Sequence, residues 1–278
     1  MMGCSFLRSP DPLPAGVSLC AWFDELARQL LTDCNLLITG QPHRIVEIEF
    51  YYHSPDHPDP FTHRDPMQQE FGRWYFHRAG GTYRNGSFKG LDLAIGNVDA
   101  HGGILLRGLE TPDGKLVDGP SLLVNHLLTV TGTEGIAALD AAINGRLAWD
   151  ASSPLRLEAV ATDDPRRVFR SARVGLSLKR ARGNTEMPRF ILRPYRYLTE
   201  PRRTAKGKLL LVLALYTEGL DVDTIHQLTG CPRRSIVRYL QEFEVGRQEV
   251  NFEPYFGVEL EPSALCRLYG ICHGRGSR

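Results

Sequence analysis

The sequence lacks an uninterrupted apolar run of eighteen residues, and no secretory signal peptide is recognisable in it. It also lacks an excess of charge of either sign, because the formal net charge is +1 at pH 7. The overall charge therefore does not by itself favour nucleic acid or an anionic membrane as a partner. We expect a cytoplasmic protein without a membrane partner.

Metal-binding motifs are missing as well. The six cysteines include no Cys-x-x-Cys pair followed by a second pair at zinc spacing. Two weaker groupings do not match a standard ligand spacing: one consists of His53, His57 and His63, the other of Cys266, Cys272 and His273. We therefore predict reduced thiols, no metal site and no cofactor.

The composition is that of a globular protein, with 42% hydrophobic and 23% charged residues in a chain of 278. Apolar spacing predicts an amphipathic helix over residues 17–34, and strand patterns dominate from there to residue 193. We predict strands at 44–52, 72–78, 91–95, 103–107, 155–161, 172–178 and 189–193, and helices at 118–128 and 133–144. This order of elements indicates the α+β class.

The segment 44–52 is the most informative of these strands. Its sequence is rich in β-branched and aromatic residues, and two carboxylates, Glu47 and Glu49, interrupt the apolar run. Because residues two apart on a strand point to the same face, both carboxylates lie on one side. A carboxylate on an apolar strand is costly unless it is paired or used. It therefore belongs either to a salt-bridged, half-exposed face or to a functional site.

Two stretches have the composition of a nucleic-acid contact. Aromatic and basic residues are interleaved between residues 73 and 89, where aromatic rings offer faces for bases and cations offer contacts for phosphates. Between residues 165 and 208 fourteen Lys and Arg residues stand against two acids. The aromatic stretch could instead be part of a sheet core, and the basic stretch could instead be a solvated face.

The composition changes near residues 194–203, and three helical segments follow at 206–218, 221–228 and 232–244. This layout is that of a helix-turn-helix, in which the last helix enters a groove of DNA. Arg233, Arg234 and Arg238 would then contact phosphates or bases. A three-helix bundle that serves only for packing is the alternative, and residues 245–278 carry no clear motif.

Four motifs occur in the order in which they occur in the alkyladenine (3-methyladenine) DNA glycosylase family. The first motif, at Arg44–Tyr51, resembles that family's Arg-hydrophobic-Val-Glu-x-Glu-x-Tyr pattern. The motifs at Leu105–Glu110 and Gly119–Leu123 resemble its Leu-Leu-Arg-x-Leu-Glu and Gly-Pro-Ser-x-Leu, and a Pro-Arg-Phe-Ile-Leu sequence follows at 188–192. The resemblance covers about residues 43–193. It implies a mixed α/β domain around a curved antiparallel sheet.

The resemblance also assigns roles to residues. Glu49 matches the family's general base, which activates the water that attacks C1′ of the sugar. Tyr51 matches the aromatic residue that stacks on the flipped base, His63 matches the pocket histidine, and Arg107 matches the arginine that supports the base pocket. These roles suit the chemistry, because a glycosylase must extrude its base, orient a water and hold phosphates.

The sequence departs from the family where the duplex wedge and the pocket floor are expected. In the family a tyrosine wedges into the duplex where the base has left. Lys89 matches that tyrosine by its position in the motif, whereas Phe88 or Tyr83 matches it by its aromatic ring. At the floor the family has an asparagine, where this chain has Gly96 followed by Asn97. A glycine there predicts a wider pocket and a bulkier base, and the loop between Tyr51 and His63 is three residues longer. We count Arg84 and Ser121 among the expected DNA contacts.

These observations predict three regions: an N-terminal extension with an amphipathic helix at 1–42, a catalytic domain at 43–196, and a helix-turn-helix region with a tail at 204–278. The expected activity is that of a monofunctional DNA glycosylase acting on double-stranded DNA. The excised base would be an alkylated purine or a bulky modified base such as the glucosylated hydroxymethylcytosine of phage DNA. The enzyme would accordingly serve DNA repair or antiphage defence. Three alternatives remain open. The enzyme could cleave the strand by a lyase reaction through Lys89, or it could be an N-glycosidase that acts on RNA or nucleotides. The protein could also be a DNA-binding regulator with an inert core.

Overall fold

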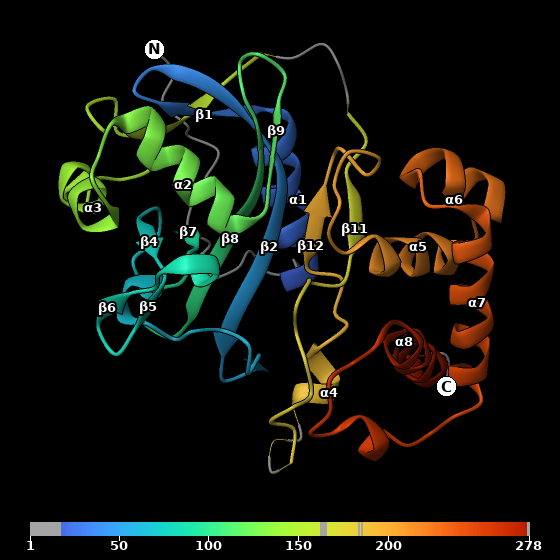
Figure 1. The fold of residues 1–278 in the computed structure, drawn as a ribbon. Helices are drawn as coiled ribbons and strands as arrows, with labels where there is room; N and C mark the ends of the chain where they lie inside the picture. Colours follow the sequence, from blue (N-terminus) through green and yellow to red (C-terminus); the bar gives the residue numbers. More distant parts are fainter. Residues whose placement is uncertain (1–17, 162–165, 183, 185, 277–278) are drawn as a thin grey trace. The chain divides into compact units, whose positions relative to one another are not determined.

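The computed structural model describes residues 18–161, 166–182, 184 and 186–276, which form two compact units (Figure 1). The first unit takes its described residues from Met1–Pro58, Thr62–Val168 and Tyr197–Thr199. The second takes them from Asp59–Phe61, Phe169–Arg196 and Glu200–Arg278. Each unit has its own core and is described by itself.

The first unit is a curled antiparallel sheet with helices packed on it, and the strand order through its centre is β10-β1-β2-β8-β7-β4. Its helices are α1 (Leu19–Thr32), α2 (Pro120–Thr131), α3 (Ile136–Ile143) and the short 3-10 helices η1 (Pro66–Gln69) and η2 (Gly86–Phe88). Its strands are β1 (Cys34–Ile38), β2 (Gln41–Ser54), β3 (His57–Pro58), β4 (Trp74–Phe76), β5 (Arg78–Ala79), β6 (Thr82–Tyr83), β7 (Leu91–Ala94), β8 (His101–Glu110), β9 (Leu116–Asp118) and β10 (Leu155–Ala159).

The long strand β2 is the centre of this sheet, and it contains the predicted carboxylate strand. It pairs with β1 on one side and with β8 on the other, with two register shifts around Glu47. Helix α1 begins at the N-cap Ser18, whose side chain accepts a hydrogen bond from Ala21 N, and it packs its apolar stripe on β2. Phe23 of α1 stacks on Phe50 at 4.4 Å between ring centroids. One face of β2 is therefore covered by α1, which leaves the face of Glu49 for other contacts.

The second unit is mostly helical. It contains β11 (Phe169–Ser171), α4 (Met187–Phe190), α5 (Lys208–Thr217), α6 (Val222–Thr229), α7 (Arg233–Arg247), the 3-10 helix η3 (Glu253–Tyr255) and α8 (Pro262–Gly276), and β12 (Arg196–Leu198) runs across the division between the units. The three helices predicted between 206 and 244 are confirmed as α5, α6 and α7. Helix α8 lies in residues 245–278, where we recognised no motif. It packs on α7, and Gly246 and Gly270 allow the two backbones to come close.

Two predicted strands are wrong. Residues 172–178 form no strand, because Gly175 has a φ of +82° that interrupts an extended backbone, and the strand β11 lies just before them. Residues 189–193 were expected to be extended, but Pro188 stands at the start of helix α4 and favours its first turn. Apart from Asp59–Phe61, the second unit thus begins at Phe169, well before the change of composition near residues 194–203.

The core of the second unit explains that division. Its buried cluster joins residues before and after the expected boundary: Ala172, Leu178, Met187, Ile191, Leu210, Leu213, Phe243 and Tyr269 belong to it. A C-terminal region that started at residue 204 would lack about half of these core residues. Among the described residues no single helix is long and apolar enough to cross a membrane, and only α2 and α3 taken together, bent by 67° at their junction, reach that length.

Candidate active site

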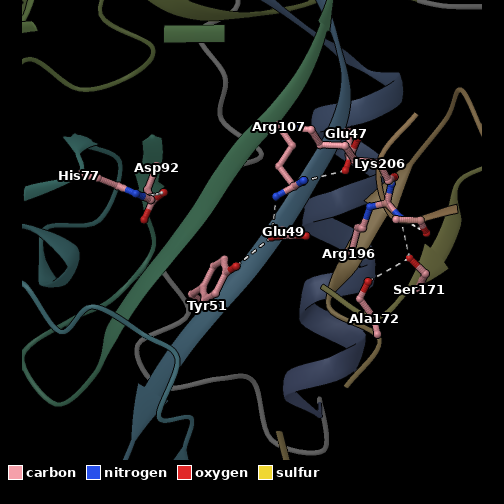
Figure 2. A network of polar contacts seen from close by, with 11 residues as sticks. Glu47, Glu49, Tyr51, His77, Asp92, Arg107, Ser171, Ala172, Arg196 and Lys206 are labelled. Carbon is pink, nitrogen blue, oxygen red and sulfur yellow. Dashed lines mark hydrogen bonds and ion pairs between the residues drawn. The ribbon is translucent and has the colours of Figure 1, made fainter. Parts of the chain in front are cut away.

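The two carboxylates of β2 converge on one arginine from the neighbouring strand, as Figure 2 shows. Arg107 of β8 donates from Nε to Glu47 Oε1 at 2.8 Å and from Nη1 to Glu49 Oε2 at 3.3 Å. All three side chains are buried, and that of Glu49 has no exposed surface. The prediction that Glu47 and Glu49 lie on the same side is confirmed, and neither faces solvent as a half-exposed strand would require.

The two carboxylates stabilise the charged form of Arg107. Burial disfavours the charged guanidinium, but the nearby Glu49 and Glu47 outweigh it, so the pKa of Arg107 is raised above its usual value. One fixed positive charge thus stands between two buried carboxylates. Arg44, at the start of the same motif, pairs with Glu110 at 2.9 Å.

Tyr51 completes the group. Its hydroxyl donates to Glu49 Oε2 at 2.9 Å, so one carboxylate oxygen of Glu49 receives bonds from both Tyr51 and Arg107. These two donors fix the orientation of the carboxylate. A fixed, buried carboxylate is suited to orient a water, to accept its proton and to stabilise a positive charge that develops beside it.

The predicted pocket histidine lies in a second group of rings. His63 contacts Tyr75 and His77, with ring centroids 6.2 and 4.4 Å away. Although part of His63 is open to solvent, burial of the imidazole and the neighbouring His77 lower its pKa to about 4. His63 is therefore neutral at pH 7 and can stack on or hydrogen-bond to a ligand without carrying charge.

Sequence reasoning missed a third group that lies beside these rings. His77 Nε2 is 2.7 Å from Asp92 Oδ1, and Gln68 of η1 donates to Asp92 Oδ2 at 3.1 Å. Asp92 is buried in the apolar strand β7. The same signal that singled out Glu49, a carboxylate inside an apolar strand, was present in the sequence Leu91-Asp92-Leu93. It could have found this group.

The predicted floor residues occupy a tight turn. Asn97 pairs with Ala100 through their backbones, and its side chain accepts a hydrogen bond from Asp99 N, so it shapes the turn. A side chain at Gly96 would meet the carbonyl oxygens of Gln68 and Ala100, each at 2.2 Å. The space that a larger residue would fill is therefore already taken. The expectation that Gly96 widens the pocket is wrong at this position.

The aromatic and basic residues between 73 and 89 fall into two kinds. Tyr83 donates to Asp140 at 2.6 Å, and Arg84 donates to the carbonyl of Arg78 at 3.3 Å, so both stabilise the β5–β6 hairpin and α3. Phe88, in contrast, is 70% exposed. Of the three candidates for the wedge, Phe88 is thus the one that projects from the unit, because Lys89 hydrogen-bonds to Asn125 of α2.

The predicted helix start at residues 118–128 is confirmed as that of α2. Gly119 is its N-cap, with a φ of 121°, and Pro120 occupies the first turn. Ser121 donates to the carbonyl of Gly86 at 2.7 Å, which ties α2 to η2 below the exposed Phe88. Ser121 therefore supports this edge of the unit.

In the second unit the three predicted arginines lie on α7, the third helix of the helix-turn-helix arrangement. All three are exposed. Arg233 pairs with Asp223 of α6, whereas Arg234 and Arg238 line a hollow of about 620 Å³ along α7 together with Ser235, Val237 and Gln241. The spacing places Arg234 and Arg238 one turn apart on one side of the helix.

The basic segment 165–208 is only partly a surface. Arg173 is fully buried, bonds Asp59 at 2.6 and 3.3 Å and lies against the rings of Phe61 and Tyr195. Arg196 is also buried and donates to Ser171 and to the carbonyls of Lys206 and Gly207. The count of positive charges in this segment therefore overstates what a phosphate would meet.

No group of three His, Cys, Asp or Glu residues that could hold a metal ion occurs among the residues that the structure describes. Comparison with known families finds no family model that matches the chain. An uncharacterized protein of Acanthamoeba polyphaga mimivirus is similar to it, with 36% identity over 122 residues. These residues are 38% of this chain and 56% of the viral protein, so the chain spans about half the length of this relative.

Proposed function

We propose that the protein is a monofunctional DNA glycosylase that flips a modified base into a pocket and hydrolyses its N-glycosidic bond. The observation that carries the proposal is the buried group of Glu49, Tyr51 and Arg107. These residues occupy the positions at which the chain resembles the alkyladenine DNA glycosylase family. A regulator with an inert core has no need of a buried carboxylate that is oriented by two donors.

The proposed reaction follows from the chemistry of the bond. As C1′–N breaks, positive charge develops on the sugar, and the carboxylate of Glu49 stabilises it. Glu49 accepts a proton from a water, whose oxygen forms the new bond to C1′. The product is an abasic site and a free base. No lysine amine is needed for this route, and Lys89 is held by Asn125 of α2.

Double-stranded DNA is the proposed partner. Phe88 would occupy the gap that the extruded base leaves, since it is exposed at the edge of the first unit. Arg234 and Arg238 would add phosphate or base contacts from α7. These two arginines also favour the alternative, a DNA-binding regulator, in which α7 alone carries the function.

Mass spectrometry of released bases tests the proposal. Wild type and Glu49→Gln are incubated with methylated DNA, deaminated DNA and phage DNA that carries glucosylated hydroxymethylcytosine. We expect one base to be released by wild type and its release to fall by a factor of at least about 100 in the variant, because the general base is lost.

Glu110→Gln is the matched control, because it makes the same chemical change in a carboxylate that pairs with Arg44 on the same sheet. It should release the base at the wild-type rate. Full activity of Glu49→Gln would contradict the assigned mechanism. Absence of release from every DNA by wild type, with tight DNA binding retained, would favour the regulator.

A further inference from the structure

The second unit contains a cavity of about 800 Å³ that the proposed function does not use. Its walls come from α4 and the residues after it, from the residues on both sides of η3, and from α8. The apolar floor of the cavity is formed by Ala181, Leu192, Phe252, Phe256 and Tyr269. A cavity of this volume lies in the range that small organic ligands occupy in proteins.

The apolar floor is an extension of the core of the second unit. Ala181, Leu192 and Tyr269 belong to the buried cluster of that unit, and Phe252 and Phe256 pack against the cluster while they stay partly exposed. An apolar body that covers such rings removes their surface, and its own, from water. The floor therefore suits the apolar part of a ligand.

Positive charge surrounds this floor. Arg182, Arg189 and Arg193 line the cavity, and all three are exposed. Glu186 pairs with Arg189 at 3.2 Å near the surface and offsets one of the three charges. None of the described residues that line the cavity is an Asp or a Glu. The arginines therefore give the cavity a net positive charge at pH 7.

Two of these arginines are held near each other. The guanidinium carbons of Arg189 and Arg193 lie 5.5 and 5.9 Å from the centroid of the same ring, that of Phe190. Arg193 also donates from Nε to the backbone carbonyl of Arg189 at 3.2 Å. Because these contacts restrict both side chains, less entropy is lost when they bind a ligand. Guanidinium groups match the geometry of carboxylate and phosphate oxygens.

The ionisable residue of the floor does not oppose an anion. Burial raises the pKa of Tyr269 to about 12, so its hydroxyl is neutral at pH 7. Thr217, at the end of α5, also lines the cavity and has no charge. The structure places Cys272 and His273 in the wall of this cavity as well, whereas Cys266 is buried in the core.

We propose that this cavity binds a small organic anion, in which a carboxylate, sulfonate or phosphate is attached to an apolar body. The anionic group contacts Arg189 and Arg193, and the apolar body covers the floor. An inorganic anion would leave the floor in water, and a neutral apolar molecule would make no use of the arginines. The proposal does not rest on the glycosylase function, because every residue that it uses belongs to the second unit.

The test uses the full chain and two fluorescent probes with the same ring system. 1-Anilinonaphthalene-8-sulfonate carries an anionic group, and N-phenyl-1-naphthylamine has the same body without that group. Fluorescence titration gives the affinity for each probe. We expect wild type to bind the sulfonate, and absence of binding would overturn the proposal.

Arg189→Gln combined with Arg193→Gln tests the part played by charge. The affinity for the sulfonate should fall by a factor of at least about 10, because hydrogen bonds to charged groups are lost, whereas the affinity for the neutral probe should change by less than about twofold. An equal change for both probes would show that the arginines do not contact the anionic group.

Arg247→Gln combined with Arg267→Gln is the matched control. It also removes two positive charges from exposed arginines of the second unit, and neither residue lines the cavity. Both affinities should stay at the wild-type values. If the two double variants weaken sulfonate binding equally, the probe responds only to the net charge of the protein, and the proposal is wrong.

Phe252→Ala tests the part played by the floor. It should weaken the binding of both probes by at least about fivefold, because truncation of the ring removes apolar contact surface. Urea denaturation checks that the variant unfolds as wild type does. If such a variant binds both probes with wild-type affinity, the apolar body does not lie on this floor.

Competition distinguishes two sources of the anion. Dodecanoate represents acyl carboxylates, and 1-naphthyl phosphate represents aromatic phosphates. We expect at least one of them to displace the sulfonate from wild type, and the one that does so identifies the class of ligand. Displacement by neither would overturn the proposal, because the sulfonate would then bind through features that other organic anions lack.

Discussion

At the scale of single residues, Arg107 is the side chain on which the site depends. It bonds Glu47 and Glu49 in a buried region, so its removal leaves two buried carboxylates facing each other. Breaking a buried ion pair by deleting one partner costs far more than the pair contributes as a whole. Sequence resemblance gave Arg107 a place in the base pocket, but only the structure shows it between the two carboxylates.

Arg107→Met should therefore lower the free energy of unfolding by about 3–5 kcal/mol, as measured by urea denaturation. Arg156→Met is the matched control, because Arg156 pairs with Glu158 at 3.5 Å near the surface and such pairs contribute less than about 1 kcal/mol. A similar decrease in the free energy of unfolding in both variants would show that burial of Arg107 does not increase its contribution to stability.

At the scale of elements, strand β2 and helix α7 present their functional side chains in different ways. In β2 the alternation of the strand aims Glu47, Glu49 and Tyr51 inward, and both faces of the strand are covered. In α7 the buried Ile236 and Phe243 hold the helix on the unit and leave Arg234 and Arg238 outside. A helix with this pattern is suited to contact phosphates, whose attraction is weakened by salt.

Arg234→Gln combined with Arg238→Gln should weaken binding to duplex DNA and reduce the slope of log K against log salt by up to about 2, since each phosphate contact contributes about 0.9. Fluorescence anisotropy at several salt concentrations measures the slope. Arg247→Gln, at the far end of the same helix and paired with Glu244, should leave it unchanged. An unaltered slope in the double variant would argue against DNA contact by α7.

At the scale of the whole molecule, the described residues form two units whose boundaries do not follow the order of the chain. Residues 169–196, predicted to close the catalytic domain, contribute Ala172, Leu178, Met187 and Ile191 to the core of the C-terminal helices. Residues 59–61 also belong to that unit, through the buried pair of Asp59 and Arg173. Local composition does not reveal such long-range partners.

A fragment of residues 204–278 should therefore lack a cooperative thermal transition, because it would expose the apolar surface that residues 169–196 cover. A fragment of residues 169–278 that carries Arg173→Met, so that no charge is left buried without Asp59, should show one. Circular dichroism during heating compares the two. A sharp transition in the shorter fragment would mean that its helices pack without the preceding segment.

The sequence by itself determined the elements whose signal is local. The carboxylate strand, the start of α2 and the three helices from 206 to 244 follow from strand and helix patterns in the sequence, which act between near neighbours. The α+β class follows from their order. The catalytic roles of Glu49, Tyr51 and Arg107 stay a prediction that rests on resemblance and on the geometry of their contacts.

Only the tertiary structure decided which distant residues meet. The pairing of His77 with Asp92 depends on the register of β4, β7 and β8 and on two glycines that leave room over the strands. The burial of Arg173 depends on Asp59, which is 114 positions away in sequence. Such contacts depend on the free energy of packing and desolvation in three dimensions, and residue types read in order carry no information on which partners satisfy them.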